Sequence, residues 1–408
     1  MTKTAEQILG KRAIAAVRKP INQAGGLPGA AYTSQEFFDL EQAKFFPRTW
    51  MGVGFKADIP NPGDAMPIMI GKLPIILARN NAGEIKAFHN VCRHRAATVL
   101  TKPEKGLKTL TCPYHAWSWD LDGSLKAIPF FDGTKDGSRT GLDRCKLGLT
   151  PLRCAEWHHW IFVNIDGKAP PIEKHVEPLN KIVTGTEIGA TKLGKRQDWE
   201  FQANWKFQND NWETYHHIWV HKGIFNKMSD DLELKTGEPW TETLQDGSFV
   251  TLKARKGRPP RTKSGGEHDV KHPLPKIPLT SGASRTVCTS VLFPNVTVTV
   301  TENHLASVII DPLAPDRTVA KMGFFFAGNG ATGRIYAPAR EQVLNRWLGK
   351  SRKPGGRDGI RSQDFGIWEE QQIARHSPVA DQLVFSPVWE RNVHHFQKQL
   401  LDVIQGIH

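Results

Sequence analysis

Short apolar runs separated by turn residues dominate the first part of the chain after residue 46. They cover Met51–Phe55, Ala65–Ile70, Leu73–Ala78 and Lys86–Val91, and glycine, proline and asparagine stand between them. Such runs are typical of β-strands joined by tight turns. A further strand at Trp160–Asn164 is expected to end this region. The pattern therefore predicts a strand-rich domain over residues 46–167.

The segments on either side of this domain have a different pattern. Residues 1–45 predict an irregular arm and a short helix over Ser34–Ala43, with the Ser34 side chain as its N-cap. Residues 168–198 are rich in Lys, Glu and Pro and predict a linker with a helix.

The second half of the chain combines β-branched strands with amphipathic helices. Because strands precede helices and no repeat is evident, residues 168–408 are expected to form an antiparallel sheet with helices across it. The fold class is therefore α+β. The expected strands are Asp198–Ala203, Thr286–Phe293, Val296–Thr301, Ala306–Asp311 and Ala320–Ala327, and the expected helices are Ala337–Leu348, Gln363–His376 and Val388–Ile404.

The stretch Asn204–His221, NWKFQNDNWETYHHIWVH, carries the first candidate metal site. Two imidazoles, His216 and His221, with a carboxylate can hold divalent iron and leave positions open. Residues five apart on a regular helix point about 140° apart, at about 100° per residue. Both histidines reach one ion only if the backbone between them is irregular. The alternative is a buried aromatic helix whose histidines are merely packed.

Two loops carry the second candidate site. Cys92-Arg93-His94 and Cys112-Pro113-Tyr114-His115 each supply one thiol and one imidazole, with seventeen residues between His94 and Cys112. Zinc fingers usually place both cysteines in one loop and both histidines in the other. The mixed loops instead favour a [2Fe-2S] cluster with two Cys on one iron and two His on the other.

Bulky residues and the remaining cysteines surround these loops. Trp117 and Trp119, with Pro113, are expected to pack over the second loop and exclude water. Cys145 and Cys154 have no ligand partner at a suitable spacing, so we expect small core residues there.

The composition is that of an ordinary globular protein, with 39% hydrophobic and 23% charged residues among 408. No apolar run approaches the ~20 residues that span a bilayer, so no membrane segment is expected. An odd, sparse set of five cysteines and the lack of a signal-like start favour a cytoplasmic, reducing location.

The formal charge of +13 raises the question of nucleic acid binding. The basic residues are spread along the chain, apart from a run between Lys253 and Lys263 among glycines and prolines. We interpret that run as a solvated loop and expect no nucleic acid partner. A basic surface would also attract an acidic redox partner or an anionic substrate.

With these motifs in place, the chain resembles the catalytic α subunits of the Rieske non-haem iron ring-hydroxylating oxygenases. The resemblance implies a Rieske β-sandwich domain followed by a helix-grip catalytic domain that holds mononuclear Fe(II). It rests on FPRTWMGVGF (46–55), AFHNVCRHRAATV (87–99), CPYHAWSWDLDG (112–123), WIFVNIDG (160–167), NWK (204–206) and LFPN (292–295).

The resemblance also implies roles for individual residues. Cys92, His94, Cys112 and His115 would hold the Rieske [2Fe-2S] cluster, and His216 and His221 would bind the mononuclear iron. Glu213 would take part in catalysis by hydrogen-bonding a ligand histidine on each side of a subunit interface and so fixing both tautomers.

The third iron ligand is expected late in the chain. Asp364 matches the family's late aspartate, and Gly366 would leave room for a close approach. From the residues alone, Asp364 could equally cap the helix that follows it. Asp358 and Glu369 remain alternatives.

Three departures from the family pattern stand out. Ala96 and Ala116 occupy positions where many members have glycine after the ligand loops. The acidic–asparagine pair ahead of the bridging acid is either Asn209-Asp210 or Asp210-Asn211. The bridging acid is Glu213 rather than Asp, as in a branch that includes oxygenases of quaternary ammonium compounds.

The resemblance implies a terminal oxygenase that uses O2 to hydroxylate or demethylate a small organic, aromatic substrate, as in the catabolism of aromatic compounds. Electrons would come from an NAD(P)H-dependent reductase, with or without a ferredoxin. The members form rings, usually homotrimers, with or without a β subunit. Two alternatives are an N-demethylating monooxygenase of a quaternary ammonium compound and a Rieske electron-transfer protein without catalysis.

Overall fold

The computed structural model describes residues 3–138, 141–212, 216–217, 219–224, 240–245, 249–254, 270–283, 288–353 and 358–407. The chain divides into two compact units. One spans Phe46–Ala169, and the other joins residues 1–45 with residues 170–408. The N-terminal segment, which the sequence suggests as a separate arm, thus packs with the second unit.

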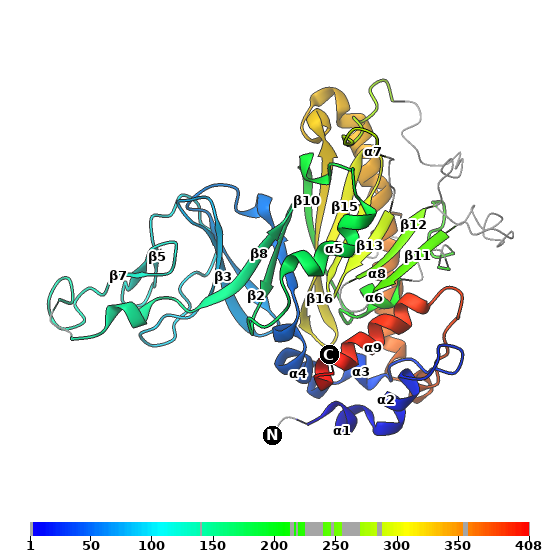
Figure 1. Cartoon of the computed structure of the whole chain (residues 1–408), viewed down its shortest axis with the longest axis horizontal. Helices are drawn as coiled ribbons and strands as arrows, with labels where there is room; N and C mark the ends of the chain where they lie inside the picture. Colours follow the sequence, from blue (N-terminus) through cyan, green and yellow to red (C-terminus); the bar gives the residue numbers. More distant parts are fainter. Residues whose placement is uncertain are drawn as a thin grey trace. The chain divides into compact units, whose positions relative to one another are not determined.

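The first unit contains two antiparallel sheets. Strands β1–β4 form where the apolar runs predict them, and the sheet order is β1-β9-β8-β4-β3-β2 (Figure 1). A smaller sheet has the order β5-β6-β7. The strands are β1 Met51–Phe55, β2 Ala65–Ile70, β3 Leu73–Arg79, β4 Ile85–His89, β5 Leu110–Thr111, β6 Ser118–Trp119, β7 Leu125–Ala127, β8 Pro151–Trp157 and β9 Trp160–Asn164, with 3₁₀ helices η1 Phe46–Arg48, η2 Lys56–Asp58 and η3 Arg144–Leu147.

A single buried cluster of side chains joins the smaller sheet to the larger one. Ile76 of β3 and Phe88 of β4 belong to it, and so do Trp119 of β6 and both loop cysteines, Cys92 and Cys112. The two cysteine loops follow β4 and β5 directly. The core therefore fixes the positions of both loops.

The second unit is built on a seven-stranded antiparallel sheet of order β10-β16-β15-β14-β13-β12-β11 (Figure 1). Valine, isoleucine and phenylalanine fill its central strands, which are almost completely buried. The strands are β10 Thr191–Phe201, β11 Trp240–Gln245, β12 Phe249–Ala254, β13 Cys288–Leu292, β14 Val296–Val300, β15 His304–Ala314 and β16 Arg317–Ala327.

Helices from both ends of the chain pack in this unit. Helix α5 packs against β12 and β13, α7 against α8, and α9 against both α4 and α6. No helix among the described residues is long and apolar enough to span a bilayer. The helices are α1 Ala5–Leu9, α2 Lys11–Val17, α3 Ala30–Thr33, α4 Gln35–Lys44, α5 Ile172–Ile182, α6 Phe207–Asp210, α7 Ala337–Leu348, α8 Ile360–Ala374 and α9 Arg391–Gln405, with 3₁₀ helices η4 Ile188–Ala190, η6 Gly328–Ala331, η7 Arg334–Tyr336 and η8 Pro378–Asp381.

The predicted α+β architecture is confirmed: a domain of two antiparallel sheets precedes a seven-stranded sheet with helices laid across it. The Ser34 cap is also confirmed, because its side chain accepts a hydrogen bond from Phe37 N at 3.3 Å. Helix α8 begins at Ile360, three residues before the predicted start. Of the basic run, Lys253 belongs to β12, and the positions from Arg255 to Lys263 lie outside the described residues.

Candidate metal centres

The first centre consists of two loops with the same backbone turn. In one loop, Ala96 N donates to Cys92 O at 3.0 Å and Cys92 N donates to Ala97 O at 2.8 Å. In the other, Ala116 N donates to Cys112 O at 3.1 Å and Cys112 N to Trp117 O at 2.8 Å. Each turn therefore aims a buried thiol inward.

The turn requires a left-handed residue four positions after each cysteine. Ala96 has φ 57° and Ala116 has φ 56°. An L-residue in this region costs about 1–2 kcal/mol relative to its ordinary conformations, which explains why glycine suits these positions. Alanine at positions 96 and 116, where many family members have glycine, therefore allows the turn but leaves it strained.

The two thiols and the two imidazoles converge. Burial raises the pKa of the Cys92 thiol, and a hydrogen bond with Cys112 raises it further. The His94 and His115 ring centroids lie 4.7 Å apart. Burial, followed by the nearby His115 and Arg95 charges, lowers the pKa of His94. The neutral imidazole is the form that binds a metal.

His94 provides the clearest sign that these residues fit a metal cluster. Its Nδ1 atom is buried and has no hydrogen-bond partner among the described residues. Its ring stacks on Trp117 at 5.0 Å with an interplanar angle of 7°, so the ring is firmly oriented. A buried, oriented nitrogen beside two thiols fits a cluster with mixed Cys and His ligation.

The surroundings match the sequence expectation only in part. Trp117 contacts His94, and Trp119 is buried with its Nε1 donating to Leu147 O at 2.9 Å, whereas Pro113 is exposed. The prediction that Cys145 is a small core residue is wrong, because Cys145 is exposed in η3. Cys154 is half-buried in β8, where its Sγ donates to Ile85 O at 3.2 Å.

The second centre groups His217, His221 and Asp364, whose ligand atoms lie within 4.8 Å of one another. Asp364 Oδ1 is 3.5 Å from His221 Nε2 and 3.8 Å from His217 Nε2. Burial lowers the pKa of His221, against the opposing effect of Asp364. Two imidazoles and one carboxylate form the donor set that suits a non-haem iron site.

Asn211 also belongs to this centre. Its Nδ2 donates to Asp364 Oδ1 at 3.2 Å and lies 3.4 Å from His217 Nε2. The sequence left the acidic–asparagine pair unassigned between two registers. The structure places Asn211 against the Asp364 carboxylate, and the assignment of the pair stays a prediction.

Helix α8 brings two further polar groups to the centre, one beside the Asp364 carboxylate and one beside the His221 ring. Arg361 Nη1 lies 3.5 Å from Asp364 Oδ2, and its guanidinium lies 5.4 Å from the Trp347 ring centroid. Gln363 Oε1 lies 3.1 Å from His221 Nδ1. Arg361, Gln363 and Asp364 are all buried.

The histidine pair differs from the sequence prediction. The His216 side chain is 48% exposed, its Nδ1 lies 3.8 Å from Glu390 Oε1, and its ring stacks on Trp389. The structure therefore places His217, rather than the predicted His216, beside His221 and Asp364. Glu213 lies outside the described residues.

The expected break in the helix is present: α6 ends at Asp210, and the described residues between Asn211 and Ile224 adopt turns and bends. His217 and His221 can therefore reach one point without a regular helix between them.

The carboxylates of the two alternatives to Asp364 accept hydrogen bonds from other parts of the chain. Asp358 Oδ2 accepts hydrogen bonds from the backbone of Lys350 and Ser351 at 2.9 and 3.1 Å. Glu369 Oε1 accepts from Gln202 N at 2.9 Å. Asp364 itself lies inside α8, so it is not an N-cap. A Cβ added at Gly366 would meet no atom of the described residues within 4 Å outside its own helix backbone, so the close approach expected there is not seen.

Buried charges anchor α6, which precedes the centre. Lys206 Nζ lies 2.7 Å from Glu41 Oε1, and both side chains are fully buried. Asp210 accepts hydrogen bonds from Tyr32 and from Gln397 Nε2. The motif is thus tied to helices α3 and α4 near one end of the chain and to α9 near the other.

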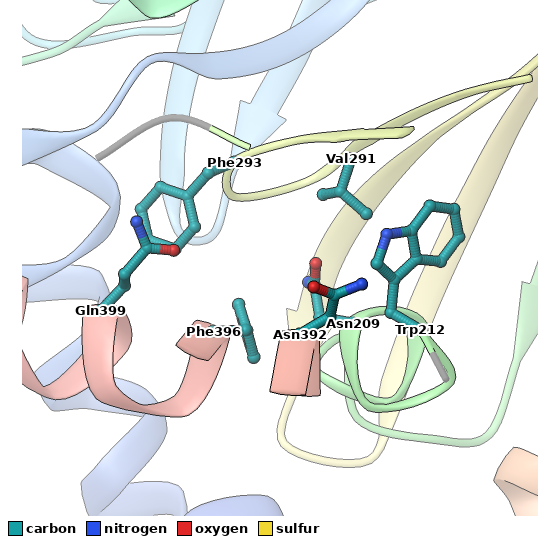
Figure 2. A pocket seen from close by; sticks show the side chains of 7 residues that line it. All are labelled: Asn209, Trp212, Val291, Phe293, Asn392, Phe396 and Gln399. Carbon is teal, nitrogen blue, oxygen red and sulfur yellow. The ribbon is translucent and has the colours of Figure 1, made fainter. Parts of the chain in front are cut away.

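A small pocket of about 10 Å³, which has room for a single water molecule, lies beside the same motif. Figure 2 shows the Trp212 and Phe293 rings on opposite sides of it, with the amides of Asn209 and Asn392 between them. Both amide atoms of Asn392 are buried without a partner among the described residues. The lining residues are Asn209, Trp212, Val291, Phe293, Asn392, Phe396 and Gln399, and none carries a charge.

A cysteine–histidine sandwich domain followed by a sheet-and-helix domain with a two-histidine, one-carboxylate group defines a Rieske-type iron protein. Residues 49–136 match the Rieske [2Fe-2S] domain. Residues 188–406, more than half of the chain, match the family described as "Ring hydroxylating alpha subunit (catalytic domain)". The chain belongs to this family, whose cofactors are a Rieske [2Fe-2S] cluster and mononuclear iron.

Curated relatives of two kinds are similar to the chain. It is 32% identical over 203 residues to the glycine betaine monooxygenase oxygenase subunit of Chromohalobacter salexigens, covering 50% of this chain and 44% of the relative. It is 30% identical over 246 residues to the biphenyl dioxygenase subunit alpha of Metapseudomonas furukawaii, covering 56% and 53%. The chain therefore spans about half the length of the curated relatives it matches.

Solved structures share the fold over nearly the whole chain. Naphthalene 1,2-dioxygenase from Rhodococcus sp. bound to indole has a TM-score of 0.75 at 21% identity, covering 99% of each chain. The quaternary ammonium Rieske monooxygenase CntA, described as revealing inter-subunit electron transfer, has a TM-score of 0.71 at 20% identity, covering 96% of this chain and 98% of that one.

Proposed function

We propose that this chain is the terminal oxygenase component of a multicomponent Rieske oxygenase. The observation that carries the proposal is the presence of two different metal-binding groups in one chain. A protein that only transfers electrons needs the two thiols and two imidazoles of the first unit. The buried group around Asp364 and His221 has no use in such a protein, but it suits dioxygen chemistry.

The residues of the first unit hold and shield the cluster. Cys92 and Cys112 supply thiolates, and His94 and His115 supply imidazoles. The cluster, when bound, supplies single electrons, and the mononuclear iron supplies dioxygen activation. Trp117 stacks on His94 and limits both ring movement and water access.

In the second unit, His221, Asp364 and one imidazole of the His216–His217 pair hold the iron. Motif spacing favours His216, and side-chain placement favours His217. Asn211 orients the Asp364 carboxylate by donating to Oδ1.

Glu213, supported by the family resemblance, hydrogen-bonds ligand histidines on two subunits and links the two centres. Electrons come from an NAD(P)H-dependent reductase, with or without a ferredoxin. The chains assemble as a homotrimer in the cytoplasm, with or without a β subunit, and neighbouring chains exchange electrons, in line with the inter-subunit transfer described for the CntA protein.

The substrate is a small aromatic compound that is hydroxylated or demethylated. The likeness to the biphenyl dioxygenase subunit alpha supports this choice. A quaternary ammonium cation is the other class of substrate, and aromatic side chains can bind such a cation through cation–π contacts. N-demethylation of such a cation is the second candidate, favoured by Glu213 and by the glycine betaine relative.

Iron analysis and turnover test the proposal together. We expect about three irons per chain, two in the cluster and one mononuclear. With a surrogate reductase, oxygen consumption should rise with aromatic compounds in a substrate panel. Two irons per chain and no substrate-dependent oxygen uptake would favour the electron carrier, whereas uptake only with quaternary ammonium compounds would select the second candidate.

A further inference from the structure

Gln363 is a buried amide held by two contacts on opposite ends of its side chain. Its Nε2 donates to Lys222 O at 3.2 Å, and its Oε1 lies 3.1 Å from His221 Nδ1. Gln363 is only 5% exposed.

These contacts fix which way the amide faces. A backbone carbonyl only accepts hydrogen bonds, so the NH2 group of Gln363 must face Lys222 O. The Gln363 carbonyl oxygen then faces His221, and it too can only accept. His221 must therefore carry its ring proton on Nδ1.

The opposite ring nitrogen of His221 follows from this assignment. In a neutral imidazole with the proton on Nδ1, Nε2 has a free lone pair. That nitrogen faces the candidate ligands, 3.5 Å from Asp364 Oδ1. Gln363 immediately precedes Asp364 on α8, so one helical turn supplies both a ligand and the group that orients another ligand.

We propose that Gln363 is a positioning residue, which holds His221 in the Nδ1–H tautomer with Nε2 directed at the metal. This inference rests on the proposed iron site around His221 and Asp364. It assigns a function to a residue that does not itself bind the metal. Groups that hold a ligand histidine in this way typically change metal affinity by about 10–100-fold when removed.

Three substitutions separate this role from general packing. Gln363→Met keeps the length of the side chain and removes both polar atoms. Gln363→Glu retains an oxygen that accepts the Nδ1 proton. Gln372→Leu is the matched control, because Gln372 is another buried amide of α8 that contacts Asn204 N and Tyr32 O and none of the candidate ligands.

The readout is the binding of Co²⁺, whose visible absorption reports the coordinating groups, to protein freed of its mononuclear metal. We expect Gln363→Met to weaken Co²⁺ binding about 10–100-fold, Gln363→Glu to recover most of that loss, and Gln372→Leu to bind as the wild type does. Circular dichroism and thermal unfolding verify that each variant is folded. Should Gln363→Met not fold, the inference stands on Gln363→Glu, which must bind within a few-fold of the wild type.

Two results would overturn the inference. One is equal Co²⁺ affinity in Gln363→Met and Gln372→Leu, and the other is a Gln363→Glu variant no better than Gln363→Met. The proposed function fails in a different way. In that case the wild type would bind Co²⁺ no more tightly than His221→Ala or Asp364→Ala does.

Discussion

Adjacent histidines at 216 and 217 occupy different environments in the structure. His217 is 13% exposed and faces Asp364, while His216 lies against Trp389 and Glu390. Neighbouring residues in a helical turn point about 100° apart, so one ion cannot use both from such a turn. The family motif selects His216, and the geometry selects His217.

Single alanine variants decide between the two positions. We expect one of His216→Ala and His217→Ala to lose the mononuclear iron and turnover while the other keeps the metal. Loss in His216→Ala assigns the ligand to the motif position, and loss in His217→Ala assigns it to the position that the structure shows. Metal analysis with an unchanged Rieske spectrum measures the outcome. If both variants keep full iron, no residue of this pair is a ligand.

Arg361 provides a buried positive charge at the same centre. Its guanidinium lies 3.5 Å from Asp364 Oδ2, and both side chains are almost inaccessible to water. Burial lowers the pKa of Arg361, and the Asp364 charge opposes this effect. The pairing balances the carboxylate when no metal is bound, but the same charge repels a bound dication.

Replacing Arg361 should therefore affect the metal-free and metal-loaded forms differently. Arg361→Met leaves the buried Asp364 carboxylate without this positive charge, which should lower the stability of the metal-free protein by up to about 3–5 kcal/mol. Co²⁺ restores a positive charge, so the variant should regain stability on loading and bind Co²⁺ more tightly than the wild type. Thermal unfolding with and without Co²⁺ measures both effects.

Arg375→Met is the control for this test. Arg375 is the C-cap residue of α8, and it pairs with Asp210 at 3.7 Å and not with a candidate ligand. Loss of Arg375 should lower the stability of the metal-free and the Co²⁺-loaded protein equally. An Arg361→Met variant that behaves in the same way would contradict the proposed charge balance.

At the scale of elements, the two cysteine loops contain a turn that alanine adopts only with backbone strain. Ala96 and Ala116 adopt left-handed φ values, whereas Ala97, next to Ala96, does not. Glycine reaches this conformation without strain, but it loses about 0.5–1 kcal/mol of chain entropy. The strain that glycine relieves is about 1–2 kcal/mol, so the balance favours glycine.

We therefore expect Ala96→Gly to stabilise the loop by up to about 1 kcal/mol. Ala97→Gly should destabilise it, because Ala97 packs against the core and has an ordinary φ. The temperature at which the visible absorption of the cluster bleaches reports both changes. A loss in Ala96→Gly as large as that in Ala97→Gly would show that the left-handed turn carries no strain.

The positions of helices and strands could be predicted from the sequence better than the directions of side chains. Helix α7 begins and ends as predicted, because its apolar spacing and its flanking glycine are local signals. Strand β8 was missed, because its half-buried pattern contains few β-branched residues. Helix α8 begins early, because Gly359 and the Ser362 hydroxyl form its cap.

In the candidate site, too, motif residues could be predicted from the sequence, whereas side-chain directions could not. Asp364 and His221 were predicted from motif and context, and the structure places them together. Asn211 and His217 were not assigned to the centre. Their directions depend on the turns after α6, which tertiary contacts set and residue spacing does not.

At the scale of the whole molecule, the chain is not divided at one point along the sequence. Residues 1–45 belong with residues 170–408, and the Glu41–Lys206 ion pair ties α4 to the segment that begins the iron motif. Removing one partner of such a buried pair costs about 3–5 kcal/mol, because the other charge stays buried. The N-terminal segment therefore supports the second centre.

The proposed function requires electrons to pass from the Rieske unit to a mononuclear iron, and we expect that iron to be on a neighbouring chain. A Cys92→Ser chain lacks a functional cluster, and an Asp364→Ala chain lacks a functional iron site, so neither should turn over substrate alone. When equal amounts of the two chains assemble at random, an intact iron next to an intact cluster should occur at about a quarter of all sites. Co-assembled protein should therefore show about a quarter of wild-type oxygen consumption.

The control is a mixture of the two variants assembled separately, which should stay inactive because no mixed rings form. Two different affinity tags on the variants verify co-assembly, and iron analysis verifies that each chain keeps its remaining centre. Activity in verified mixed rings means that the electron crosses between chains, since no single chain has both centres. Verified mixed rings without activity would mean that transfer stays within one chain, and the bridging role proposed for Glu213 would then have to be abandoned.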